Sequence, residues 1–198
     1  MNLRNRPVLI VGGGDVATRK AEGLSHTGAC LTVIAPAISD AITGIPDINA
    51  LRRPATETDI NDSLALVILA TDCPELQERL ALRCRALRVP VNRCDAPEDS
   101  DFVTGSLIDR PPVLAAVTSS GSPTISRLVR RRLETALEPA LLDLGRLLND
   151  IRPSVKKCMA DPVRREAFFR TWGTEEAVTK IREQGADAVR EEMQRCLF

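Results

Sequence analysis

Three consecutive glycines near the start of the chain have the spacing of a phosphate-binding turn. Gly12, Gly14 and Ala17 fit the pattern G-x-G-x-x-A, directly after the apolar run Pro7–Val11 and at the start of a helical pattern. In that setting Gly12 permits a tight turn, Gly14 lets the backbone approach a pyrophosphate, and Ala17 lets helix and strand pack closely. The N-terminus of the helix would face the anion. We therefore predict a dinucleotide site at Gly12, Gly13 and Gly14, with a ligand-free glycine turn as the alternative.

The acid that usually accompanies such a turn is missing. It is expected at the end of the second strand, where it binds the ribose hydroxyl. Here the strand Leu31–Ala35 is followed by Pro36 and Ala37. No arginine stands at that point for the 2′-phosphate of NADP either, so NAD is favoured over NADP by default only.

Asp95 is the candidate general base. It follows Val89–Asn92, a predicted strand, and ligands collect at the carboxyl ends of the strands in an open α/β sheet. A carboxylate at that edge can accept a proton from a reacting group. The alternative is an aspartate that forms the turn before Ala96 and Pro97.

Arginines gather in the second half of the chain. Arg127, Arg130 and Arg131 share one face of a predicted helix, and Arg110 ends the strand pair before it. Guanidinium groups on one face suit a ligand with several carboxylates, because each can form two parallel hydrogen bonds. The alternative is a solvated helix face balanced by the acids of the same helix.

A serine-rich turn precedes this helix. Ser119 and Ser120 lie in the run Thr118–Pro123 and can offer hydroxyl and backbone groups to an anion. An ordinary helix cap is the alternative interpretation.

The elements that must position these residues alternate between strand and helix. Short, continuous apolar runs predict strands buried on both faces, and apolar residues at helical spacing separate them. This order predicts right-handed βαβ units and a doubly wound parallel sheet, hence a Rossmann-like α/β fold. The predicted strands are Pro7–Val11, Leu31–Ala35, Leu64–Ala70 and Val89–Asn92; Ser39–Arg53 has no clear assignment.

The pattern changes after Phe102. Two strand-like runs flank Pro111 and Pro112, a long helical pattern begins near Pro123, and Pro139 is expected to kink or end it. From Pro153 onward we expect a small helical tail.

Composition narrows the class of protein. With 27 basic and 27 acidic residues the net charge is zero, which disfavours a nucleic-acid-binding protein. The longest apolar run, Leu64–Ala70, is far shorter than the ~20 residues of a membrane helix, so we expect no membrane association. The six cysteines form no C-x-x-C pair and His26 is the only histidine, so a reduced cytoplasm is expected and no zinc site is predicted.

Several separated motifs together resemble the precorrin-2 dehydrogenases, the dehydrogenase and ferrochelatase module of siroheme synthases. The resemblance covers nearly the whole chain in the same order. Its motifs are VLIVGGGDVATRK (8–20), Ala70–Asp72, NRCDAP (92–97), SLIDR (106–110) and Ser126–Leu128.

The resemblance implies an NAD-dependent oxidation of precorrin-2 to sirohydrochlorin in a homodimer. Some members also insert Fe²⁺ into sirohydrochlorin, with the iron as a substrate of chelation. It implies a Rossmann-like NAD-binding domain at 1–112, a dimerisation segment at 113–148 and a helical C-terminal domain at 149–198. Asp95 would be the catalytic carboxylate, and the arginines with Ser119 and Ser120 would bind the tetrapyrrole's carboxylates. The implied cofactor contacts are Asp15, Val16, Pro36, Ala37, Thr71 and Asn92.

Two other functions remain open from the sequence. A dinucleotide-sensing regulatory domain is possible because a Rossmann fold does not specify chemistry. A chelatase that no longer dehydrogenates is the other. The sequence carries no recognisable methyltransferase region, so we expect precorrin-2 to come from a separate enzyme.

Overall fold

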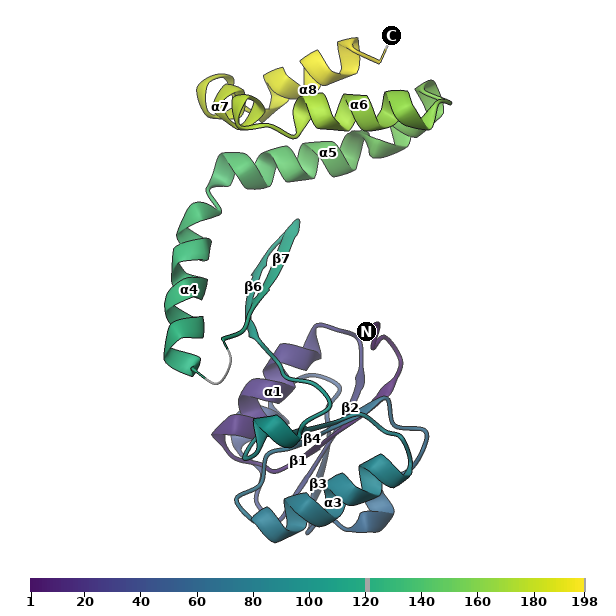
Figure 1. Cartoon of the computed structure of the whole chain (residues 1–198), viewed down its shortest axis with the longest axis vertical. Coiled ribbons are helices and arrows are strands. Elements are labelled where there is room, and N and C mark those ends of the chain that lie inside the picture. Colours follow the sequence, from purple (N-terminus) through teal and green to yellow (C-terminus); the bar gives the residue numbers. More distant parts are fainter. Residues whose placement is uncertain (120–121, 198) are drawn as a thin grey trace. The chain divides into compact units, whose positions relative to one another are not determined.

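The computed structural model describes residues 1–119 and 122–197 and contains two compact units, Met1–Val103 and Thr104–Phe198. Each unit is described by itself. Figure 1 shows the elements of both. No helix in the described ranges is long and apolar enough to cross a membrane.

The first unit is built on a parallel five-stranded sheet with the order β3-β2-β1-β4-β5. From β1 the chain adds strands outward to β3, then returns to the other side of β1 for β4 and β5. The order therefore reverses between β1 and β4, the point where such sheets open a crevice for ligands. The strands are β1 (Pro7–Val11), β2 (Cys30–Ala35), β3 (Asn49–Arg52), β4 (Leu66–Leu69) and β5 (Val91–Arg93).

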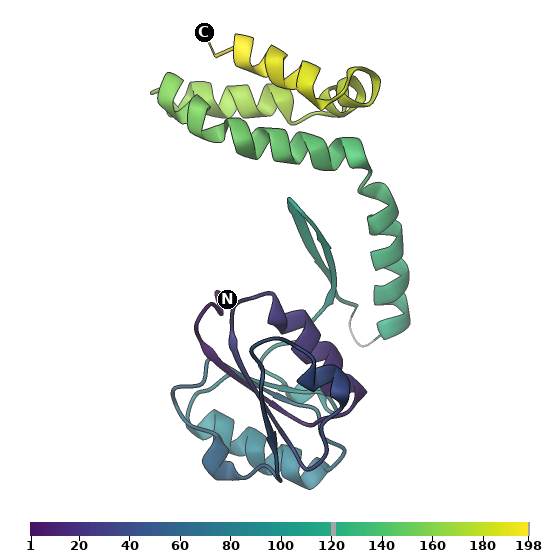
Figure 2. The same ribbon diagram turned by 180° about the vertical axis from the view of Figure 1, so that it is seen from behind.

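Helices cover both faces of this sheet. Val8 and Ile10 pack in a core with Ala17 and Ala21 of α1 (Asp15–Ser25), as alternation along a strand requires. Leu9 and Val11 point the other way, into a core with α3 (Pro74–Ala86). Figures 1 and 2 show the two helices on opposite faces. The predicted doubly wound α/β fold is confirmed. A short helix α2 (Asp40–Thr43) and two 3₁₀ turns, η1 (Glu57–Asp59) and η2 (Pro97–Asp99), complete the unit.

Two local assignments differ from the prediction. The stretch without a clear assignment contains α2 and the edge strand β3, whose residues are only half-buried or exposed and so lack an apolar pattern. β5 begins at Val91 and not at Val89. Arg88 is left-handed (φ 58°), and the N–H of Val89 donates to the Cys84 carbonyl at 2.9 Å, so these residues close α3.

The second unit starts with an antiparallel hairpin and continues as helices. β6 (Ser106–Arg110) pairs with β7 (Val113–Val117), as expected for runs that flank Pro111 and Pro112. Pro139 ends the pattern of α4 and occupies the first turn of α5, where proline is tolerated. Pro153 lies inside α5, so no new helix starts there. The helices are α4 (Pro123–Ala136), α5 (Pro139–Cys158), α6 (Pro162–Trp172), α7 (Glu175–Gln184) and α8 (Ala186–Arg195).

The helices α5 to α8 share one core, with Phe168, Trp172, Val189 and Met193 among its buried side chains. The expected boundary at 148/149 falls inside α5, and that at 112/113 falls between β6 and β7. The first compact unit ends at Val103. The three-part division by role stays a prediction.

Candidate functional site

The glycine turn between β1 and α1 is fixed by close backbone contacts. Gly12 has φ +126°, and a Cβ there would lie 2.2 Å from the carbonyl oxygen of Ala70, which follows β4. A Cβ on Gly13 would lie 2.0 Å from the carbonyl oxygen of Ala37, which follows β2. Neither position can accept a side chain without moving backbone. The turn is therefore wedged between the ends of β2 and β4, at the switch point of the sheet.

Gly14 is open where its neighbours are closed. It is the N-cap of α1, and a Cβ there would meet no atom of the described residues within 4 Å. Gly14 has no side chain to occupy the N–H groups of Asp15 and Val16 in the first helical turn, which lack acceptors within the helix. Ala17 beneath them is fully buried. Backbone donors, the positive end of the helix and open space fit the pyrophosphate of a dinucleotide.

The loop after β2 is tied to this turn. The N–H of Ser39 donates to the Gly13 carbonyl at 3.0 Å, and the hydroxyls of Ser39 and Thr18 lie 3.0 Å apart. Pro36 and Ala37, two predicted cofactor contacts, are exposed in this loop beside the glycine turn. Four of the predicted contacts, Asp15, Val16, Pro36 and Ala37, thus lie around one turn.

A cation stands near the end of β2 that the sequence pattern did not reveal. Arg52, the last residue of β3, pairs in register with Ala35, and its guanidinium donates to the Ile38 carbonyl at 2.9 Å. The expectation that no arginine follows β2 holds along the chain, but Arg52 reaches the same point from the neighbouring strand. The position of Arg52 beside the end of β2 follows from the pairing of β3 with β2, and β3 was not predicted from the sequence.

Thr71 lies in the loop between β4 and α3, at the same sheet edge. Its carbonyl accepts a hydrogen bond from Nε2 of Gln77 at 2.6 Å. Gln77 is buried, and its Oε1 has no partner among the described residues. Sequence reasoning missed Gln77, although a glutamine in the buried stripe with Leu80, Ala81 and Cys84 is an available signal.

Asn92 is buried in β5 and bonds to the protein's own chain. Its Nδ2 donates to the Phe102 carbonyl at 2.9 Å and to the Ser100 hydroxyl at 3.4 Å. These bonds hold the segment after η2 against β5. The predicted contact between Asn92 and the cofactor stays a prediction.

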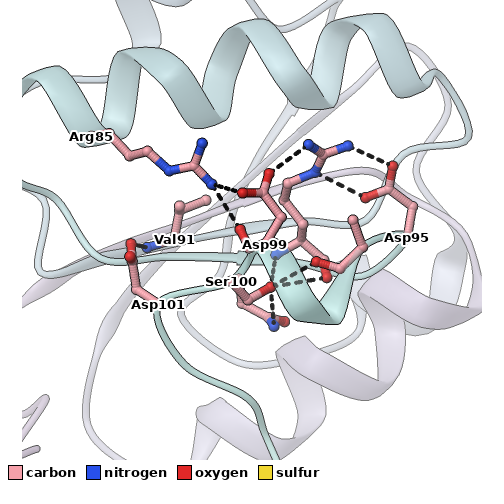
Figure 3. A network of polar contacts seen from close by, with 9 residues as sticks. Arg85, Val91, Asp95, Asp99, Ser100 and Asp101 are labelled. Carbon is pink, nitrogen blue, oxygen red and sulfur yellow. Dashed lines mark hydrogen bonds and ion pairs between the residues drawn. The ribbon is translucent and has the colours of Figure 1, made fainter. Parts of the chain in front are cut away.

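Asp95, labelled in Figure 3, follows β5 on the β4 side of the switch point. Arg93 binds its carboxylate through two hydrogen bonds. Nε of Arg93 donates to Oδ1 at 3.2 Å and Nη2 donates to Oδ2 at 3.0 Å. The side chain of Asp95 is 29% exposed, whereas that of Arg93 is 12% exposed. The carboxylate is thus oriented and still reachable from solvent.

A second acid, Asp99, continues this network. Its Oδ2 accepts from Nη1 of Arg93 at 2.8 Å, and its Oδ1 forms an ion pair with Arg85 of α3. Hydrogen bonds from Arg93 and Arg85 lower the pKa of Asp99 below its usual range. Hydrogen bonds to Asp95 and Asp99 raise the pKa of Arg93. Arg93 and Asp99 therefore stabilise each other's charged forms.

The predicted substrate-binding arginines belong to the second unit. Arg110, Arg127 and Arg131 are exposed, and Arg130 is half-buried. Nη1 of Arg130 donates to Oε1 of Glu134 at 2.8 Å, so one arginine of the face is balanced by an acid of its own helix.

The serine turn begins the same helix. Oγ of Ser119 lies 2.6 Å from Oγ of Ser126 and also contacts the Ser122 carbonyl. These contacts fasten the start of α4. Ser120, the other predicted residue of this turn, lies outside the described residues. The anion-binding role of the turn stays a prediction.

The only histidine lies far from these groups. His26 lines a cavity of about 660 Å³ at the amino ends of β2 and β3, the sheet edge opposite the glycine turn. This position gives His26 no access to Asp95 or to the glycine turn. Within the described residues, no three or more His, Cys, Asp and Glu side chains form a group that could hold a metal ion.

A known protein family matches the first unit of the chain. Residues 1–106, more than half of the chain, match a family described as "Putative NAD(P)-binding". This chain belongs to that NAD(P)-binding family. The match spans the glycine turn, the loops after β2 and β4, and Asp95. The match confirms that this region is NAD(P)-binding. The placement of the dinucleotide at Gly12, Gly13 and Gly14 stays a prediction.

Curated relatives of this NAD(P)-binding chain carry the name siroheme synthase. Those of Psychrobacter sp. (strain PRwf-1) and Tolumonas auensis are 38% and 39% identical, each over 170 residues, or 84% of this chain. That of Methylococcus capsulatus is 37% identical over 172 residues. The chain spans about a third of the length of these relatives: 35%, 36% and 36%.

A solved structure shares the fold of the NAD(P)-binding chain from end to end. It is titled SirC, precorrin-2 dehydrogenase, and matches with a TM-score of 0.78 over 98% of this chain and 97% of its own. Its sequence identity is 18%, so the likeness shows the fold. The resemblance inferred from motifs is confirmed by both comparisons.

Proposed function

We propose that this chain oxidises precorrin-2 to sirohydrochlorin with NAD⁺ as the oxidant, within siroheme biosynthesis. One observation carries the proposal: the open turn at Gly14 and the carboxylate of Asp95 lie at the same edge of one sheet. The names of the siroheme synthase relatives and of the matched dehydrogenase supply the reaction.

In this proposal the glycine turn with α1 binds the dinucleotide, and Asp95 acts on the substrate. When bound, NAD⁺ supplies the acceptor for the hydride that the macrocycle loses. The first-turn N–H groups of α1 bind the pyrophosphate, and the glycine turn holds the helix end in place. Asp95 accepts the proton that leaves the substrate, so the substrate loses a hydride and a proton in total. Asp95 lies on the β4 side of the switch point, opposite the β2 loop.

Exposed arginines of the second unit bind the carboxylates of the tetrapyrrole in this proposal. Arg127 and Arg131 form no ion pair within the described part of the chain, so their guanidinium groups are available. Arg110 and the half-buried Arg130 complete the cationic set. Each can bind a carboxylate through two parallel hydrogen bonds.

The choice between NAD⁺ and NADP⁺ needs its own measurement. The loop after β2 has neither an acid for the ribose nor an arginine, while Arg52 reaches that loop from β3. Titration of both dinucleotides by calorimetry tests the choice. Tighter binding of NAD⁺ supports the proposal. Tighter binding of NADP⁺ would contradict it and would indicate that Arg52 binds the 2′-phosphate.

Ferrochelation of sirohydrochlorin is a second and separable part of the proposal. The carboxylate of Asp95 can accept pyrrole protons or guide Fe²⁺ as an oxygen ligand. Addition of Fe²⁺ to sirohydrochlorin and the wild-type protein, followed by the absorbance of siroheme, tests it. An insertion rate equal to that without protein would remove the chelatase from the proposal.

A homodimer through the middle segment is also part of the proposal. Ile125, Leu128, Val129 and Leu133 lie exposed on one side of α4, an unusual apolar surface for a helix in water. A second copy of this chain would cover them. Light scattering after size exclusion should give twice the chain mass, and Leu128→Asp should shift it towards one chain mass. A wild-type monomer would contradict this part.

The decisive experiment is an anaerobic assay with precorrin-2 and NAD⁺. We expect NADH and sirohydrochlorin to appear together, and Asp95→Ala to lose most of the turnover. Asp62→Ala, an exposed acid between η1 and β4, is the matched control and should keep it. Binding of NAD⁺ without NADH formation by the wild type would contradict the dehydrogenase. Iron insertion would then indicate a chelatase, and no reaction would indicate a sensor.

A further inference from the structure

Arg93 is engaged on every side of its guanidinium. Nε and Nη2 donate to the two oxygens of Asp95, and Nη1 donates to Asp99. The side chain is 12% exposed, the most enclosed member of this charged group. A guanidinium that binds both oxygens of a carboxylate fixes the plane of that carboxylate as well as its distance.

The other acid is held from the opposite side. Arg85 of α3 forms an ion pair with Asp99 and donates to its carbonyl at 2.9 Å. Four charges therefore alternate from the site to the helix, in the order Asp95, Arg93, Asp99, Arg85 (Figure 3). Arg93 can turn away from Asp95 only by breaking its bond to Asp99 as well.

The backbone under this chain of charges is fastened as well. Oγ of Ser100 accepts from the N–H of Arg93 at 2.8 Å, and Asp101 accepts from the N–H of Val91 at 2.9 Å. Both bonds join the segment after η2 to β5. The position of Arg93 is consequently set by its own strand and by the turn that follows.

We propose that Arg93, braced by Asp99 and Arg85, is the positioning residue that fixes the Asp95 carboxylate for proton removal. The inference rests on the proposed dehydrogenase. A carboxylate oxygen has two lone pairs, so each oxygen can bind Arg93 and still accept a substrate proton. Without Arg93 the carboxylate can rotate, and a misplacement of about 1 Å can cost about a hundredfold in rate.

A merely structural role predicts a different result. Because the Arg93 side chain is only 12% exposed, a structural role predicts that its loss lowers the unfolding free energy or the binding of NAD⁺ along with turnover. If Arg93 positions Asp95, its loss affects turnover and leaves binding and folding nearly unchanged.

The test compares Arg93→Ala with wild type, with kcat and KM for precorrin-2 and Kd for NAD⁺ measured separately. We expect kcat to fall about a hundredfold, with KM and Kd within about twofold, because the lost interaction acts on the reacting group. Asp99→Asn should lower kcat less, since Arg93 loses its brace and keeps Asp95. Arg83→Ala, an exposed arginine of α3 with no ion pair in the described residues, is the matched control.

Chemical rescue and a conservative variant sharpen the test. Millimolar guanidinium chloride should restore part of kcat in Arg93→Ala and none in Asp95→Ala, with sodium chloride at the same ionic strength as the control. Arg93→Lys keeps the charge and loses the two parallel bonds, so its kcat should stay well below that of wild type. This variant also decides the question if Arg93→Ala does not fold.

The outcomes separate the inference from the function on which it rests. Wild-type turnover with an unchanged kcat in Arg93→Ala and Arg93→Lys would overturn the inference alone. A kcat loss accompanied by an equal loss of NAD⁺ binding or of folded protein would assign Arg93 a structural role and also overturn it. No turnover by the wild type would overturn the proposed function and the inference together.

Discussion

The two candidate binding regions of this chain are built in opposite ways. At the sheet edge of the first unit, Gly12 and Gly13 lie against backbone carbonyls, and Arg93 forms an ion pair with Asp95. On α4 of the second unit, Arg127 and Arg131 are exposed and form no ion pair within the described residues. Contacts within the chain therefore fix the glycine turn and Asp95, whereas Arg127 and Arg131 have no acidic partner among the described residues. Substitutions of the two enclosed glycines should therefore act on folding, and substitutions of the exposed arginines on ligand binding.

Gly12→Ala should have the largest effect on the free protein. The added Cβ would lie 2.2 Å from the Ala70 carbonyl oxygen, at a backbone φ of +126°. Strain and collision together should cost about 3 kcal/mol or more of unfolding free energy. Denaturant unfolding measures it. Gly23→Ala is the matched control in α1, where the Cβ meets no atom within 4 Å, and should stabilise by about 0.5–1 kcal/mol. Equal effects at both positions would contradict the wedged turn.

Gly14→Val should separate binding from folding within the same turn. Gly14 has φ −89° and ψ −166°, which any residue adopts, and its Cβ position is open. The change in stability should stay below about 1 kcal/mol. The valine side chain would occupy space next to the first-turn N–H groups, so Kd for NAD⁺ should rise at least about tenfold, or 1.4 kcal/mol. Calorimetric titration measures it, and an unchanged Kd would place the pyrophosphate elsewhere.

The arginine face is tested by a double charge reversal, Arg127→Glu with Arg131→Glu. Hydrogen bonds to charged groups contribute about 1.5–3 kcal/mol each, so KM for precorrin-2 should rise at least about tenfold. Kd for NAD⁺ and the unfolding midpoint should not change, because both side chains are exposed. Arg83→Glu with Arg164→Glu, two exposed arginines of α3 and α6, changes the net charge by the same amount and is the control. A parallel loss of NAD⁺ binding would show that the two regions are not independent.

The sequence was sufficient where signals are local. The glycine spacing and the buried run of β4 lie within a few residues, and both predicted their structure correctly. Arg52 and β3 were missed because an edge strand with half-exposed residues carries no periodic apolar pattern. The ion pair between Arg93 and Asp95 could not be predicted either, because Arg93 is held in place by Asp99, which in turn pairs with Arg85 of α3. Contacts between side chains that are far apart along the chain produce no regular residue spacing from which they could be predicted.

The smallest effect is expected from an ion pair of the first unit away from the glycine turn. Arg53 donates to both carboxylate oxygens of Asp59, at 2.9 and 2.5 Å. The hydrogen bond from Arg53 lowers the pKa of Asp59 to about 2. Because the folded pKa lies below the unfolded value of about 3.9, this stabilisation is present above pH ~4 and is lost as the pH falls towards 2.

Asp59→Asn should therefore lower stability at neutral pH and flatten the decline of stability between pH 4 and 2. The Arg53 side chain is 45% exposed and that of Asp59 11%, so the difference at pH 7 should be about 1 kcal/mol, the upper end of the range for exposed pairs. Unfolding midpoints across this pH range measure it, with Asp62→Asn as a control acid that forms no ion pair in the described residues. Identical pH profiles for wild type and Asp59→Asn would mean that Arg53 does not act on Asp59 in solution. If NAD⁺ binds at the glycine turn as proposed, its Kd should not respond to this substitution, in contrast to Gly14→Val.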